Sequence, residues 1–265
     1  MLRETFLHID GVGRRREEIL WRSGIRTWDD VPRLGSGAGL PASVVHRIDS
    51  EVVRSDEALR RGRYRYFADA LPAREHWRAL PEFRGAVGYL DIETTGLSIG
   101  RDAVTVVGVY DGRRERSFVK GENLDELPAT LDRMKILVTF NGGRFDLPFL
   151  RRAFPRMRLD QIHVDLLHGM HRLGYHGGLK RIEAQLGIER SEETAGLRGW
   201  DAVRLWEAHE SGDEGALELL LQYNMEDVIH LETLADLAYT GLRTQIRGEE
   251  FVTADRLERA RGRAP

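Results

Sequence analysis

The sequence predicts an α/β protein in which a mixed β-sheet is flanked by helices and follows a small all-helical module. Three strand-length apolar segments open the sheet region, at residues 86–93, 104–110 and 116–120, and helical and strand patterns alternate after them. Such a succession is typical of an α/β sheet domain. Before residue 86 the apolar residues follow helical spacing instead.

The composition is that of a globular chain, with 41% hydrophobic residues over 265 positions, which is enough to bury a sizeable core. The formal net charge is −3, so nucleic-acid binding cannot be inferred from total charge. The absence of cysteine excludes disulfides, thiolate zinc sites and cysteine nucleophiles. The sequence has no signal-peptide pattern and no long apolar run, so we expect a cytoplasmic protein without a membrane partner.

The N-terminal module is predicted to consist of short helices around a tight turn at Gly11-Val12-Gly13. A Gly-x-Gly turn lets backbone N–H groups at the start of the second helix face an anion. The arrangement resembles the helix-hairpin-helix motif, which binds DNA phosphates, and this resemblance implies phosphate contacts at Gly11, Gly13 and Arg14. Glu17 departs from the motif, which has a small apolar residue there, and a hairpin that only packs is an equal alternative.

We expect four segments along the chain. The helix-hairpin-helix-like module covers residues 1–34, a linker and helical connector cover residues 35–85, and the sheet domain covers residues 86–240. The glycine-rich stretch that starts at Gly35 is the clearest flexible joint. Residues 241–265 form a C-terminal extension that we expect to be partly disordered.

The sheet domain contains further predicted elements after its first strand. Asp111-Gly112 predicts a hairpin turn between the second and third strands. A continuous apolar run at residues 136–140 predicts a buried strand. Helical spacing marks the remaining elements, at residues 124–134, 179–186, 201–209 and 214–239.

Asp91 and Glu93 are the first candidates for a functional site. Side chains alternate along a strand, so the two carboxylates lie on one face while Leu90 and Ile92 lie on the other. Like charges this close raise one another's pKa, and such a pair usually binds a cation or shares a proton. For these two residues alone, a surface strand with solvated acids is the more frequent alternative.

Two later segments carry acids in distinctive settings. Asp146 follows the buried strand at a strand-to-helix turn, where open α/β sheets place their sites. Tyr223 and Asp227 are four residues apart in the longest predicted helix and share one of its faces. That helix is strongly apolar, so a charged Asp227 is costly to leave unpaired, which favours a metal or a partner.

Taken in order, these segments resemble the three exonuclease motifs of the RNase H-like DEDD superfamily. The motifs are Asp91–Leu97, Asn141–Leu150 and Tyr223–Asp227. A tyrosine four residues before the last aspartate is similar to the tyrosine-bearing (DEDDy) subgroup, as in the proofreading domains of family B DNA polymerases. Stand-alone RNase H-like predicted exonucleases of bacteria and archaea also look similar. The resemblance covers residues 86–240 and implies an RNase H-like exonuclease domain with a mixed sheet.

The resemblance implies that Asp91, Glu93, Asp146 and Asp227 are catalytic residues that hold two divalent cations. Carboxylate oxygens suit Mg²⁺ or Mn²⁺, because hard cations prefer oxygen ligands. Two such ions can activate a water and stabilise a leaving 3′ oxygen. The Tyr223 hydroxyl would orient the attacking water, and a core tyrosine with a hydrogen-bonded tip is its alternative.

The substrate contacts are also implied by resemblance. Relatives hold the 3′-terminal nucleotide with the residues after the second carboxylate, which are Thr94, Thr95 and Leu97 here. Asn141 is a candidate for phosphate or sugar contact, and a turn-forming asparagine is the alternative. Lys180 begins a predicted helix and could meet a phosphate, but we expect a solvated surface lysine.

The predicted function is that of a metal-dependent 3′→5′ exonuclease acting on DNA, at single strands or 3′ ends. A ribonuclease with the same chemistry is an alternative, because nothing in the sequence separates acceptance of the 2′-hydroxyl from its rejection. A non-catalytic DNA-binding or scaffold protein that retains the fold is another. The expected partner is nucleic acid, with DNA favoured over RNA. A polymerase or helicase partner is a hypothesis that follows from the low positive charge.

Overall fold

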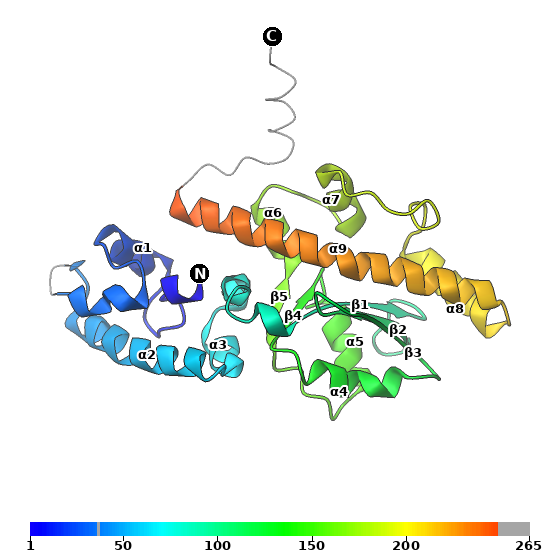
Figure 1. Cartoon of the computed structure of the whole chain (residues 1–265), viewed down its shortest axis with the longest axis horizontal. Helices are drawn as coiled ribbons and strands as arrows, with labels where there is room; N and C mark the ends of the chain where they lie inside the picture. Colours follow the sequence, from blue (N-terminus) through cyan, green and yellow to red (C-terminus); the bar gives the residue numbers. More distant parts are fainter. Residues whose placement is uncertain (36–37, 249–265) are drawn as a thin grey trace, which may run out of the picture. The chain divides into compact units, whose positions relative to one another are not determined.

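The computed structural model describes residues 1–35 and 38–248. The chain divides into two compact units, which Figure 1 colours from blue to red along the sequence. The first unit is Met1–Gly85 with Asp160–Val164, and the second is Ala86–Leu159 with Asp165 onward. Of the C-terminal extension expected to be partly disordered, residues 249–265 lie outside the described residues.

The first unit is helical. Its elements are the α-helices α1 (Arg14–Arg22), α2 (Ala42–Arg60) and α3 (Tyr64–Ala70) and the 3₁₀ helices Leu2–Glu4, Trp28–Arg33 and Ala73–Ala79. The helix α2 is amphipathic, because its buried residues, among them Val44, Ile48 and Val52, recur every three or four positions. Residues 42–60, which we expected in a connector, belong to the same compact unit as the glycine turn.

A buried ion network explains why Glu17 departs from the helix-hairpin-helix pattern. Glu17 is 1% exposed and accepts a hydrogen bond from the Thr5 hydroxyl at 2.6 Å. Arg78, equally buried, pairs with Glu17 at 3.1 Å and with Glu75 at 2.9 Å. Glu75 also pairs with Arg14. The carboxylate of Glu17 therefore has a structural role, and Arg14 already has a carboxylate partner.

The structure contains a five-stranded mixed sheet, which confirms the predicted α/β fold class. The strands are β1 (Val87–Thr94), β2 (Val104–Tyr110), β3 (Glu115–Val119), β4 (Ile136–Thr139) and β5 (Ile162–Asp165). Their order across the sheet is β3-β2-β1-β4-β5. β1 pairs antiparallel with β2 and parallel with β4, and β2 pairs antiparallel with β3.

Helices cover both faces of this sheet (Figure 1). The helices of the second unit are α4 (Leu127–Leu131), α5 (Asp146–Ala153), α6 (Leu166–Arg172), α7 (Leu179–Leu186), α8 (Gly199–Glu210) and α9 (Glu214–Arg247). On one face Leu90 and Ile92 pack against apolar residues of α4 and α5. On the opposite side of the sheet, Val106 packs against Trp206 of α8 and Leu220 of α9. The alternation predicted for β1 is therefore observed, with Leu90 and Ile92 in the core.

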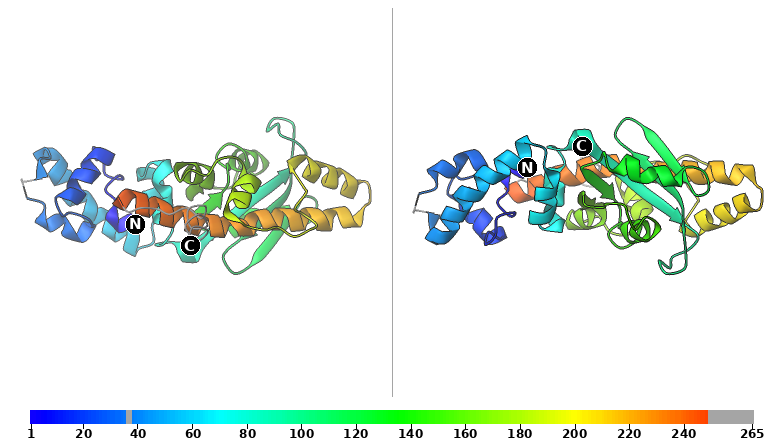
Figure 2. Two further views of the ribbon diagram at one scale, coloured as in Figure 1. Left: turned by 90° about the horizontal axis from the view of Figure 1, so that it is seen from above. Right: turned by 90° about the horizontal axis from the view of Figure 1, so that it is seen from below.

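The helix α9 runs across β1 and β2, as the views in Figures 1 and 2 show. It begins at a cap in which the Asp213 side chain accepts hydrogen bonds from the Gly215 and Ala216 N–H groups. It ends at Gly248, whose φ of 71° is left-handed and suits glycine. The helix is longer than the predicted 214–239, whereas the predicted helix at 124–134 is reduced to a 3₁₀ turn and α4.

Within residues 1–35 and 38–248, none of the helices has both the length and the apolar character needed to cross a membrane.

Candidate active site

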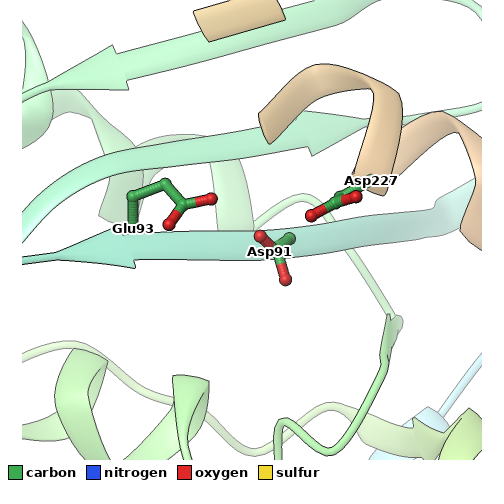
Figure 3. A group of neighbouring side chains, drawn as sticks. All are labelled: Asp91, Glu93 and Asp227. Carbon is green, nitrogen blue, oxygen red and sulfur yellow. The ribbon is translucent and has the colours of Figure 1, made fainter. Parts of the chain in front are cut away.

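Three carboxylates from two elements meet on the face of the sheet that α9 covers. Asp91 and Glu93 extend from β1 and Asp227 from α9, and one oxygen of each lies within 4.8 Å of the others. Figure 3 shows the three side chains gathered at β1, with the Asp227 carboxylate directed toward Asp91. Strand alternation accounts for the first two residues, and the crossing of α9 supplies the third.

Burial and the charges of neighbouring groups raise the pKa values of these three acids. Burial and the charges of Asp146 and Asp227 raise the pKa of Asp91. Burial and the charges of Asp227 and Asp146 raise the pKa of Glu93. Burial also raises the pKa of Asp227, although Arg190 opposes the effect. A cation bound between the carboxylates would relieve this repulsion.

Asp146 lies near enough to Asp91 and Glu93 for its charge to act on both, but it does not belong to the group of three carboxylates whose oxygens lie within 4.8 Å of one another. It is the first residue of α5 and is 3% exposed. Burial raises its pKa to about 7, and its charge raises the pKa of both strand acids. Its Oδ1 atom is buried and has no hydrogen-bond partner among the described residues. An unpartnered buried oxygen near two further acids fits a cation ligand.

A glycine lets α9 approach β1 and β2 closely enough to form the site. Gly108 of β2 pairs with Asp91 of β1. A Cβ atom at Gly108 would lie 2.8 Å from the Val228 Cγ2 atom and would also collide with the Asn224 amide. Asn224 is fully buried, and its Nδ2 donates a hydrogen bond to the Asp91 Oδ2 at 3.0 Å. Asn224 thereby orients one carboxylate of the cluster.

Tyr223 joins the same site one helical turn before Asp227. Its side chain is buried, and its hydroxyl accepts a hydrogen bond from the Lys180 Nζ at 2.8 Å. Burial and the charges of Asp227 and Glu93 raise the pKa of Tyr223, so the hydroxyl stays protonated at neutral pH. The expectation of a solvated surface lysine at Lys180 is wrong, because Lys180 is half-buried and also donates to the Leu197 carbonyl.

A cleft of about 310 Å³ opens beside this cluster. Its lining combines two of the acids and Tyr223 with basic, aromatic and glycine residues of the surrounding elements. The residues that line it are Asp91, Phe140, Gly178, Leu179, Lys180, Arg181, Arg198, Gly199, Tyr223 and Asp227. A bound molecule would therefore meet both carboxylates and cationic side chains in this cleft.

Residues 88–239 match the sequence model of the RNase_H superfamily, which is more than half of the chain. The chain belongs to the RNase H superfamily. Family membership and the carboxylate cluster together make this a nuclease-type site. No curated protein sequence matches the chain.

Solved structures similar to this RNase H-superfamily chain include a polymerase and a nuclease. The family B DNA polymerase from the hyperthermophilic archaeon Pyrobaculum calidifontis is 20% identical with a TM-score of 0.46, over 57% of this chain and 24% of the polymerase. The chain thus spans about a quarter of that protein. Brucella melitensis NrnC with bound Mg²⁺ is 24% identical with a TM-score of 0.45, over 63% of this chain and 78% of NrnC. NrnC bound to pGG gives a TM-score of 0.43 at the same identity and coverage.

The RNase H-type site also contains residues that sequence reasoning missed. Arg190 pairs with Asp227 and makes two hydrogen bonds to Glu183, at 2.7 and 2.8 Å. Glu183 is 1% exposed and also contacts the His230 Nδ1 at 2.9 Å. Glu183 falls within the helix predicted at residues 179–186, whereas Arg190 lies in a polar stretch with no periodicity. Asn224, between Tyr223 and Asp227, was likewise missed.

The side chains at the end of β1 and in the loop after it form hydrogen bonds mainly within that loop. The Thr94 hydroxyl donates to the Gly96 carbonyl at 2.5 Å, and the Thr95 hydroxyl accepts from the Ala103 N–H at 3.0 Å. Leu97, by contrast, is 68% exposed. Of the three residues expected to hold a nucleotide, Leu97 is the one whose side chain is free to contact a ligand.

Asn141 adopts the conformation of a turn residue. Its φ of 64° is left-handed, a region in which asparagine is tolerated better than most residues. Its N–H donates to the Asp165 Oδ1 at 2.8 Å. The alternative of a turn-forming asparagine therefore accounts for the backbone conformation of Asn141.

The expected phosphate-binding turn lies in the first unit. Gly11 has a left-handed φ of 82°, and Gly13 precedes α1 as its N-cap residue. Arg14, the first residue of α1, pairs with Glu75. The turn geometry thus accounts for Gly11, whereas the pairing of Arg14 reduces its availability to an anion.

Proposed function

We propose that this protein is a metal-dependent 3′→5′ exonuclease of the tyrosine-bearing DEDD type that hydrolyses DNA. The observation that carries the proposal is the convergence of Asp91, Glu93 and Asp227 within 4.8 Å, with the Tyr223 side chain lining the same cleft. These residues come from the motifs that resemble that subgroup. Asp146 supplies the fourth carboxylate of the proposed set.

The donor set fits two divalent cations, Mg²⁺ or Mn²⁺. Asp91, Glu93, Asp146 and Asp227 offer oxygen only, which hard cations prefer, and the unpartnered Asp146 oxygen is available as a ligand. When bound, such ions supply an activated water and stabilise the leaving oxygen of a phosphodiester. The raised pKa values of the acids fit this role, because a nearby cation favours their charged forms.

Tyr223 and Lys180 are proposed to position the reacting groups. The Tyr223 oxygen already accepts a hydrogen bond from Lys180, so its own proton is directed elsewhere and can orient the attacking water. Its raised pKa keeps that proton in place at neutral pH. The ammonium group of Lys180 also brings a positive charge to the cleft, where it can stabilise a phosphate.

The substrate-binding part of the proposal rests on Thr94, Thr95 and Leu97, which would hold the 3′-terminal nucleotide, and on Asn141, which would contact its phosphate or sugar. The proposed domain arrangement keeps residues 86–240 as the exonuclease domain, with Gly11, Gly13 and Arg14 as weaker phosphate contacts of the N-terminal module. A polymerase or helicase partner that delivers the 3′ end is part of the same proposal, since the net charge of −3 favours weak intrinsic affinity for DNA.

The test is a cleavage assay with 5′-labelled single-stranded DNA, duplex DNA and RNA of one sequence. We expect a ladder that shortens from the 3′ end of the DNA in Mg²⁺ or Mn²⁺ and no cleavage in EDTA. Asp91→Asn should abolish cleavage and leave the protein folded, whereas Asp132→Asn, at an exposed acid, should cleave normally. Wild-type cleavage by Asp91→Asn would refute the assignment. Cleavage of RNA alone would show that the substrate is RNA and not DNA.

A further inference from the structure

Two arginines line the cleft without partners of their own. Arg181 belongs to α7, and Arg198 is the N-cap residue of α8. Both are exposed, and neither guanidinium has a hydrogen bond or an ion pair with any described residue. Arg190, also near the site, differs from these two arginines because it pairs with Glu183 and Asp227 and its side chain is only 6% exposed.

The acids and cations that line the cleft together suit a polyanion whose reacting end lies at the acids. Asp91 and Asp227 line it together with Lys180, Arg181 and Arg198. Carboxylates alone would repel a nucleic acid, so its phosphates must be held by cationic groups away from the acids. The guanidinium fork binds a phosphate through two parallel hydrogen bonds, and the two free arginines come from different helices.

An exposed aromatic side chain stands next to the cleft lining. Trp200 follows Gly199, which lines the cleft, and it is 64% exposed. The buried side of α8 is formed by Ala202 and Trp206, so helical periodicity places Trp200 away from the core. Packing does not explain a tryptophan in this position. An exposed indole beside free arginines is the combination on which unpaired bases stack.

We infer that Arg181, Arg198 and Trp200 form a single-strand-binding rim, which holds the unpaired nucleotides preceding the scissile phosphate. This inference rests on the proposed nuclease function and names the residues that would give it the expected preference for single strands. The arginines bind successive backbone phosphates, and Trp200 stacks on a base. A paired base cannot reach the indole, so the rim selects single strands and frayed ends over closed duplex ends.

The test is equilibrium binding of the full chain to fluorescein-labelled oligothymidylate in EDTA, measured by anisotropy at several salt concentrations. Arg181→Ala and Arg198→Ala should each weaken binding several-fold and lower the slope of log K against log salt by about 0.7, the value for one phosphate on a single strand. Trp200→Ala should weaken binding about 5- to 150-fold, and Trp200→Phe should restore part of the loss. The control is Arg204→Ala, on the same helix, because Arg204 pairs with Asp201 and does not line the cleft.

The outcomes separate this inference from the proposed function. If the arginine and tryptophan variants bind single strands within twofold of wild type with unchanged slopes, or if wild type does not bind them, the rim is refuted. An equal loss of duplex and single-strand binding in Trp200→Ala refutes the stacking role. Cleavage by wild type is scored independently in Mn²⁺. A protein that binds through the rim without cleaving refutes the nuclease proposal and leaves the binding site in place.

Discussion

The close approach of α9 to the sheet makes Gly108→Ala a demanding test of the site. The added methyl group would lie 2.8 Å from the Val228 Cγ2 atom and would collide with the Asn224 amide. Neither neighbour can yield easily, because Val228 and Asn224 are both fully buried. The helix α9 must therefore shift away from β2, or the Asn224 side chain must leave the Asp91 carboxylate.

The expected cost follows from overpacking a close-packed interface, which is about 1–3 kcal/mol. For a chain of this size, each kcal/mol lowers Tm by about 2–4 °C, so the variant should melt about 2–12 °C below wild type. The loss of activity should be larger than the loss of stability alone would cause. The same helix carries Tyr223 and Asp227, and a displacement of about 1 Å at a reacting centre can cost about 100-fold in rate.

Thermal unfolding followed by circular dichroism and the initial rate of DNA cleavage measure the two effects. Gly196→Ala is the matched control, because nothing lies within 4 Å of a Cβ atom at Gly196 and its φ is not left-handed. That variant should keep both Tm and rate. Wild-type Tm and rate in Gly108→Ala would show that the interface between α9 and the sheet has room for a methyl group. That result would refute the claim that glycine is needed at position 108.

Three further predictions concern the charges of the site. Tyr223→Phe should lower kcat by about 100-fold or more with little change in KM or Tm, because only the hydroxyl is lost; an unchanged kcat would rule out its role in orienting water. Arg190→Ala should destabilise the protein by about 3–5 kcal/mol in urea unfolding, since Glu183 and Asp227 lose a buried partner, and a loss below about 1 kcal/mol would contradict this. The pKa of Asp146 is raised to about 7 by burial, so the folded state binds more protons than the unfolded state between about pH 4 and 7. Stability in EDTA should therefore fall as pH rises through that window, and Asp146→Asn should flatten the fall; an unaltered pH profile in the variant would disprove it.

Local periodicity in the sequence determined the features of this fold that depend only on residues close together along the chain. The alternation of β1 placed Leu90 and Ile92 in the core, and it placed Asp91 and Glu93 together on the other face. The four-residue spacing of Tyr223 and Asp227 likewise predicted a shared helical face. Both inferences hold because the repeat of a strand or a helix is set by its own backbone.

The tertiary structure alone decided which partners these residues meet. Asn224 holds Asp91 across 133 residues of sequence, and Lys180 reaches Tyr223 across 43. Those contacts require the crossing of α9 over the sheet, which depends on a glycine at position 108 and on no local pattern near the acids. Sequence periodicity predicts which way a side chain faces, whereas long-range packing decides what faces it, and this is why the carboxylates were expected and their partners were not.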